Sequence, residues 1–158
     1  MESMIQKLVD LINNFDPVSY LPEIDSVMGW VETFVRLCVM AAPVIMLVFG
    51  LSYLLLPPKE ANHEAGYRFY FGMGSVEAWR FTQRLAGAVL GVLGLILTGV
   101  MLVIVMGFPN LGMMDMVWKA FWCLIWQGVL ALLANAGIWG AAALRFDAKG
   151  NYRKKKDK

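Results

Sequence analysis

Three long runs without a charged side chain constrain this sequence more than any other feature. They cover residues 37–56, 85–112 and 120–144. About 20 helical residues cross the roughly 30 Å hydrocarbon core of a bilayer, so each run is long enough to span it. Across the chain 59% of residues are hydrophobic and 16% are charged, whereas soluble domains average about 45–50% and about 25%. The sequence predicts an all-α integral membrane protein with three transmembrane helices, folded as a single membrane domain over residues 1–158.

Prolines and turn residues divide the chain into its predicted segments. We expect three transmembrane helices, over residues 27–56, 76–107 and 115–144. Pro57 and Pro58 end the first helix, Pro43 should bend it, and Pro22 should keep the stretch before it irregular. Phe108-Pro109-Asn110 forms the turn between the second and third helices.

Short polar residues mark where each helix is expected to begin. Asp25 or Ser26 caps the first helix, Ser75 the second and Asp115 the third, because their side chains accept hydrogen bonds from free backbone N–H groups. Glu77 lies in the first turn of the second helix, where a negative charge is favoured.

Three further segments lie outside the predicted spans. Residues 1–16 carry apolar side chains at helical spacing, which predicts a short amphipathic helix, either lying in the membrane interface or packed on the bundle. Residues 57–75 form a polar, glycine-rich loop that we expect to be structured. Residues 147–158 form a basic tail that we expect to be solvated.

The basic residues predict the orientation of the chain. Of the 14 lysines and arginines, all but Lys7, Arg36 and Lys119 lie between the first two helices or after the third. Basic loops stay on the cytoplasmic side of a bacterial inner membrane. We therefore expect a multi-pass protein of the bacterial cytoplasmic membrane, with its N-terminus outside and its C-terminus in the cytoplasm.

Four polar side chains lie within the predicted spans or near their ends. Glu32 and Arg36 are four residues apart, which favours an ion pair or a polar contact facing a cavity or a partner. Gln127 and Asn135 share a helix face and either bond between helices or line a substrate path. Gly87 and Gly91 favour close packing of helices, within the chain or in a homo-oligomer.

The loop and the start of the second helix contain the charged and aromatic side chains that are candidates for a binding site. Lys59, Arg68, Arg80 and Arg84 either bind lipid phosphates at the inner leaflet or only anchor and orient the helices. Trp79 is expected to anchor the second helix in the headgroup region. His63 beside Glu64 provides too few groups for a catalytic or metal site. We therefore expect no enzyme activity, no cofactor, no metal and no nucleic-acid partner.

Residues 57–87 contain a spaced pattern that consists of Asn62, Gly66, Tyr67, Arg68, Ser75, Glu77, Trp79, Arg84 and Gly87. This pattern resembles the SdpI family of bacterial membrane proteins. Members of the family carry an N-x-x-x-G-Y-R-T segment after one transmembrane helix, followed by a short Ser- and Trp-containing segment that leads into the next. Phe69 stands where members usually have threonine.

The resemblance implies a function in toxin immunity. It suggests a protein that binds a membrane-active peptide toxin, or a regulatory protein that senses one, and so acts in resistance or signalling. Arg68 would then be held near the membrane surface, within reach of Glu77 or a lipid phosphate, with Tyr67 covering its stem. The alternatives are a small transporter or lipid-binding protein, for which membrane lipids are the partners, and an accessory subunit of a membrane complex.

Overall fold

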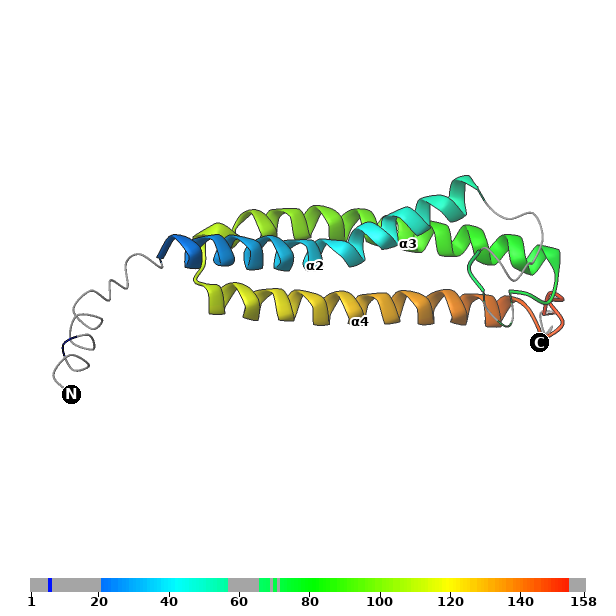
Figure 1. The fold of residues 1–158 in the computed structure, drawn as a ribbon. Helices are drawn as coiled ribbons and strands as arrows, with labels where there is room; N and C mark the ends of the chain where they lie inside the picture. The colour runs from blue at the N-terminus through cyan, green and yellow to red at the C-terminus, as the bar shows by residue number, and fades with distance from the viewer. Residues whose placement is uncertain (1–5, 7–20, 57–65, 69, 71, 154–158) are drawn as a thin grey trace.

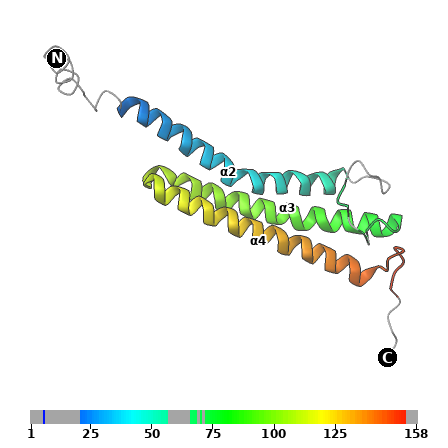
Figure 2. The same cartoon turned by 60° about the horizontal axis from the view of Figure 1, so that its bottom comes forward.

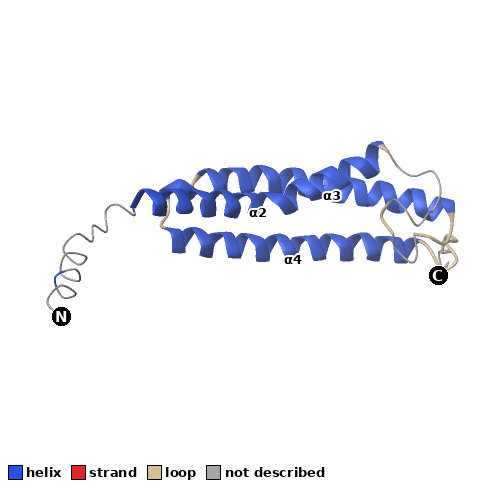
Figure 3. Ribbon diagram, viewed as in Figure 1, coloured by secondary structure: helices blue, strands red, loops and turns tan. Residues whose placement is uncertain are grey.

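The protein is described by a computed structural model that covers residues 6, 21–56, 66–68, 70 and 72–153. Its long helices are α2 (Leu21–Leu55), α3 (Val76–Met106) and α4 (Met113–Arg145), and the short 3-10 helix η2 (Phe108–Asn110) joins the last two. Figure 1 shows the three long helices running along one another, and Figure 3 shows that the described part of the chain contains helices and loops without a strand.

Each long helix is long and apolar enough to cross a membrane, so the chain is a multi-pass membrane protein. This confirms the all-α class and the three predicted spans. The predicted amphipathic helix over residues 1–16 lies outside the described residues except for Gln6. The loop residues 57–65, with Asn62, lie outside them as well.

The helix boundaries confirm one predicted cap and correct two. Ser75 caps α3, because its side chain accepts a hydrogen bond from the Ala78 N–H. The prediction for α2 was wrong: this helix begins at Leu21, and Pro22 lies in its first turn, where a missing N–H costs nothing. Asp115 does not cap α4, which begins at Met113 after Gly112. Asp115 lies in the first turn of α4, where its negative charge interacts favourably with the positive end of the helix dipole.

Glycines bring α2 and α3 into backbone contact. These two helices lie side by side in both views (Figures 1 and 2) and share the largest helix contact of the molecule. A Cβ atom on Gly87 would lie 2.8 Å from the Leu54 side chain, and a Cβ on Gly50 or Gly94 would collide with the backbone of the facing helix. The predicted small-residue pair at Gly87 and Gly91 therefore packs within the chain.

Pro43 interrupts the backbone bonding of α2. Figure 2 shows α2 bending near its middle, where Pro43 lies. Proline has no N–H, so the carbonyl of Val39, four residues earlier, loses its helical partner. The Gln127 Nε2 of α4 donates to that carbonyl at 3.1 Å. Both Val39 and Gln127 are buried. The predicted interhelical role of Gln127 is confirmed, and its partner is the carbonyl freed by Pro43.

The larger of two buried apolar clusters lies between the helices in the half of the bundle near η2, and a smaller one of Ala86, Leu90 and Ile138 lies nearer the start of α3. The larger cluster consists of Val39, Leu97, Met101, Val105, Phe108, Met116 and Ala120. Large apolar side chains are exposed along all three helices, among them Val103, Leu132 and Leu133. An apolar outer surface of this kind is compatible with contact with lipid chains.

Candidate functional site

The described parts of the loop and of the C-terminal segment meet at the start of α3. We call residues 66–68, 72–75 and 146–152 the cap. Figure 1 shows the loop in green and the C-terminal segment in orange to red at the same end of the bundle. Hydrogen bonds and glycine contacts join the two segments, so the loop is built into the fold and does more than connect two spans.

Gly66 fits a position that only glycine can fill. Its φ of +108° lies in a region that L side chains rarely adopt. A Cβ at this position would lie 2.8 Å from the Trp79 ring. Trp79 itself is completely buried. The prediction that Trp79 anchors α3 in the headgroup region was therefore wrong, because the loop covers its ring and the ring packs inside the protein.

Tyr67 joins the loop to three helices. Its backbone N–H donates to the Gln83 Oε1 and its carbonyl accepts from the Gln83 Nε2, both at 2.9 Å. Its hydroxyl donates to the Asn135 Oδ1 of α4 at 2.6 Å. Its ring meets the edge of the Tyr53 ring of α2, with centroids 6.3 Å apart. Burial raises the pKa of the Tyr67 hydroxyl above its usual range.

Gln83 was not predicted to matter, and it is the residue that fixes this part of the loop. It is fully buried in α3, and its amide offers one acceptor and one donor at fixed spacing. Both are used by the backbone of Tyr67. Sequence reasoning had little signal for this residue, because Gln83 stands between the polar residues Thr82 and Arg84. Asn135, predicted to bond between helices, instead bonds to this loop.

Ser75 links the start of α3 to the C-terminal segment. Its hydroxyl oxygen accepts from the Ala78 N–H at 3.1 Å while its O–H donates to the Gly150 carbonyl at 2.7 Å. Gly74 approaches the backbone of Gly150 so closely that a Cβ on Gly74 would lie within 2.6 Å of the Gly150 nitrogen. Gly72 packs in the same way on Thr82. Ser75, the N-cap residue of α3, thus also joins the loop to the C-terminal segment.

The C-terminal segment folds back as a small turn. Phe146 and Tyr152 form an antiparallel bridge, and Phe146 is completely buried. The Asp147 Oδ1 accepts from the Asn151 N–H at 2.8 Å and from the Lys149 N–H at 2.9 Å. The hydrogen bond from the Asn151 backbone is the main reason that the pKa of Asp147 lies below its usual range. Residues 148, 149 and 151–153 of the predicted solvated tail are exposed, and the ordered turn that residues 147–152 form was not predicted.

An open groove lies between the start of α3 and this turn. Six residues line it: Glu77, Arg80, Phe81, Arg84, Leu85 and Tyr152. Its volume is about 550 Å³. The Arg145 guanidinium lies over the Phe81 ring at 4.5 Å and faces the Tyr152 ring at 5.6 Å, which holds the two walls of the groove together.

The predicted site residues divide between this groove and the rest of the cap. Glu77 and Arg84 lie in the groove, as their shared helix face predicted. Gly66, Tyr67 and Ser75 belong to the cap, and Trp79 is the buried α3 residue against which Gly66 packs. Arg68 is exposed beside Tyr67 and is not among the residues that line the groove with Glu77.

The Glu32–Arg36 pair lies in the half of α2 far from the cap. The two side chains form the predicted ion pair between successive turns. The Arg36 Nε is buried and has no partner in the described part of the chain, and the same is true of the Gln127 Oε1.

Comparison of this chain with protein family models, curated proteins and solved structures found no match.

Proposed function

We propose that this chain is an SdpI-like protein of a bacterial cytoplasmic membrane that binds a membrane-active peptide, or a protein that senses one, and thereby acts in resistance or signalling. The observation that carries this proposal is the environment of Gly66 and Tyr67, two central residues of the family-like pattern. Gly66 is held at a positive φ against Trp79, and Tyr67 is fixed by Gln83. A segment under such constraint presents the next residue, Arg68, in one position at the surface.

The proposal places the cap in the cytoplasm and the opposite end of the bundle outside. It rests on the basic residues of the loop and the tail, which favour the cytoplasmic side. The amphipathic helix predicted over residues 1–16 then lies in the outer interface. The cap would engage a regulatory protein through Arg68.

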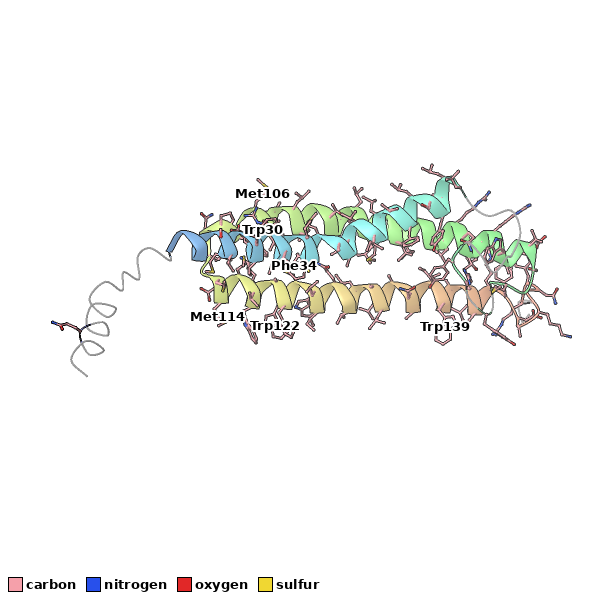
Figure 4. The ribbon with its side chains drawn as sticks, in the orientation of Figure 1. Trp30, Phe34, Met106, Met114, Trp122 and Trp139 are labelled. Carbon is pink, nitrogen blue, oxygen red and sulfur yellow. The ribbon has the colours of Figure 1, made fainter. Side chains whose placement is uncertain are left out.

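The outer end offers an aromatic surface to the peptide. Figure 4 shows Trp30 and Phe34 of α2 and Trp122 of α4 toward the end of the bundle opposite the cap. Trp30 and Phe34 are largely exposed, and Trp118 stacks on Phe121 beside Trp122. Amphipathic peptides bury their apolar face in membranes, and exposed aromatic rings at that depth give them a competing surface.

The function is tested by protection of a susceptible bacterium. The full chain is expressed, and growth and membrane depolarisation are measured against a panel of synthetic cationic amphipathic peptides. The chain should raise the inhibitory concentration of at least one peptide, and Arg68→Lys should abolish this effect, because lysine cannot copy the planar contact of arginine. Lys59→Gln is the matched control and should protect normally. Absence of protection by the wild-type chain across the panel overturns the proposal.

The orientation is tested separately with single cysteines. Asn110→Cys and Ala148→Cys are placed in a background that lacks Cys38 and Cys123, and intact cells are treated with a membrane-impermeant thiol reagent. Both positions are exposed in the structure. Position 110 should react and position 148 should react only after lysis. Labelling at 148 in intact cells contradicts the orientation.

A further inference from the structure

We propose that the groove beside the start of α3 is a binding site for a membrane phospholipid whose headgroup carries a phosphate and an ammonium, of the ethanolamine type. Arg80 and Arg84 would bind the phosphate, Glu77 the ammonium, and the apolar face of α3 one acyl chain. This site does not rest on the proposed function, because neither Arg68 nor a residue of the outer aromatic surface is among those that line the groove.

Two guanidinium groups in the groove are free to take an anion. Both Arg80 and Arg84 are exposed. Among the described residues the only ion pair joins Glu32 and Arg36, so neither groove arginine is paired with the neighbouring Glu77. Guanidinium groups form strong, often two-pronged hydrogen bonds with phosphate oxygens. The groove volume of about 550 Å³ lies within the range of roughly 300–1,000 Å³ that is usual for small-ligand sites.

The groove lies at the level of the lipid headgroups. Helix α3 has 31 residues, which at about 1.5 Å per residue gives roughly 46 Å, more than the roughly 30 Å hydrocarbon core. Arg84 is the last charged residue before the uncharged run over 85–112, so the helix enters the hydrocarbon immediately after it. Arg80 lies one turn further out. A phosphate bound to this pair would therefore occupy the depth at which lipid phosphates lie.

An apolar stripe continues from the groove along α3. Ala88, Val92 and Leu95 follow Arg84 at spacings of four, four and three residues, which keeps them on the same side of the helix. All three are exposed in the structure. Leu85 lines the groove at its apolar end and connects the two parts. A phospholipid would place its phosphate at the groove arginines and an acyl chain along the apolar stripe. Free phosphate would contact the arginines alone.

Glu77 decides which phospholipid fits best. It precedes Arg80 by three residues and Arg84 by seven, so it lies on their face of α3 and lines the same groove. A carboxylate there repels a headgroup that carries only a phosphate and attracts one that also carries an ammonium. The charges that line the groove, two positive and one negative, give the phosphate and the ammonium of phosphatidylethanolamine each an opposite partner, whereas phosphatidylglycerol leaves Glu77 without one. Arg145, which lies over the Phe81 ring, adds a third positive charge beside the groove.

The test measures lipid binding to the purified full chain in detergent by native mass spectrometry. Phosphatidylethanolamine and phosphatidylglycerol are the lipid probes, and phosphoethanolamine without acyl chains is the free-headgroup probe. Arg80→Gln with Arg84→Gln removes the phosphate ligands, and Lys149→Gln removes one positive charge of the cap outside the groove. Lipids also contact any apolar helix face, so the readout is the difference between variants. Circular dichroism checks that each variant is folded.

The double variant should bind phosphatidylethanolamine about tenfold more weakly than wild type, as expected for loss of hydrogen bonds to a charged group. Lys149→Gln should bind it like wild type. Glu77→Gln should weaken the binding of phosphatidylethanolamine and strengthen that of phosphatidylglycerol. Phosphoethanolamine should not displace the lipid at equal concentration.

Three results would overturn the site. The first is unchanged binding of phosphatidylethanolamine by the folded double variant. The second is displacement of the lipid by an equal concentration of phosphoethanolamine, which would identify a site for soluble phosphate compounds. The third is a Glu77→Gln variant with an unchanged preference between the two lipids, which would remove the ethanolamine assignment.

Discussion

Replacement of Gly66 by alanine should detach the loop from α3 while leaving the three spans in place. The new methyl group would lie 2.8 Å from the Trp79 ring, and the backbone would keep a φ of +108°. The ring has no room to move away, because Trp79 is completely buried. The loop around residue 66 must therefore move away from the Trp79 ring.

The size of the effect follows from comparing two costs. A strained φ costs about 1–3 kcal/mol and overpacking about another 1–3 kcal/mol, so keeping the loop in place would cost about 2–6 kcal/mol. Releasing it instead loses the three hydrogen bonds of Tyr67 to Gln83 and Asn135, at about 1 kcal/mol each. Release also lets water reach the buried Trp79 ring, which costs roughly another 1.5–3 kcal/mol. Release is therefore the cheaper response in the upper part of this range, and we expect a loss of about 4–5 kcal/mol that is confined to the cap.

Hydrogen exchange at the Tyr67 amide distinguishes these outcomes. This N–H is bonded to the Gln83 Oε1 in the wild type, so it should be protected there and exchange freely in Gly66→Ala. The Trp79 fluorescence should shift to the red as water reaches its ring. Gly99→Ala is the matched control, because a Cβ on Gly99 meets nothing within 4 Å. A Gly66→Ala variant with wild-type protection and fluorescence would refute the argument.

Three further perturbations test other parts of the fold. Gln127→Leu should destabilise the bundle by about 1–3 kcal/mol, because it leaves the Val39 carbonyl unpaired; a thermal midpoint equal to that of the wild type would contradict this. Gly94→Ala should destabilise by about 1–3 kcal/mol through collision with the backbone of α2, whereas Gly99→Ala should be neutral or stabilising, and equal midpoints would argue against the close contact. The pKa of Asp147 is lowered in the folded state. Its carboxylate therefore contributes fully to the stability of the C-terminal turn above the unfolded pKa of about 3.9, and this contribution is lost as the pH falls through the lower, folded pKa. The NMR shifts of the C-terminal turn should change in this acid range in the wild type and stay constant in Asp147→Asn.

The spans and the start of α3 could be predicted because their signals are local. Uncharged runs set the lengths of the helices, and Ser75 followed by Glu77 sets the first turn of α3. The start of α2 was placed too late because two signals compete there. Asp25 is a good cap residue, yet Pro22 is equally suited to the first turn of a helix that begins earlier.

The inside of the cap could not be predicted because its contacts join residues far apart in the sequence. Nothing in the spacing of Gly66 and Trp79 indicates that the first covers the second. A tryptophan near the end of a span is usually interfacial, and here a glycine without a side chain allows the loop to bury it. The partner of Gln83 is likewise a backbone group, which leaves no trace in the side-chain pattern.

Two features carried signals that could have been used. Phe146 and Tyr152 flank Asp147-Ala148-Lys149-Gly150-Asn151, and aromatic residues around a turn sequence are typical of a hairpin. The basic composition of the tail suggested solvation instead. Pro43 also predicts an unpaired carbonyl at Val39, and a deep glutamine on another span is a suitable donor to it.

The cap also determines when the protein can be complete during synthesis. The ribosome makes the chain from its N-terminus, and earlier segments fold first. Ser75 and Gly74, at the start of the second span, need the backbone of Gly150, which follows the third. In a nascent chain with two inserted spans, the start of the second span therefore still lacks its C-terminal partner. The contact forms only when nearly the last residues that the structure describes have been made. A fusion or truncation close behind Tyr152 would therefore act on Ser75 at the start of α3, 75 residues before Gly150 in the sequence.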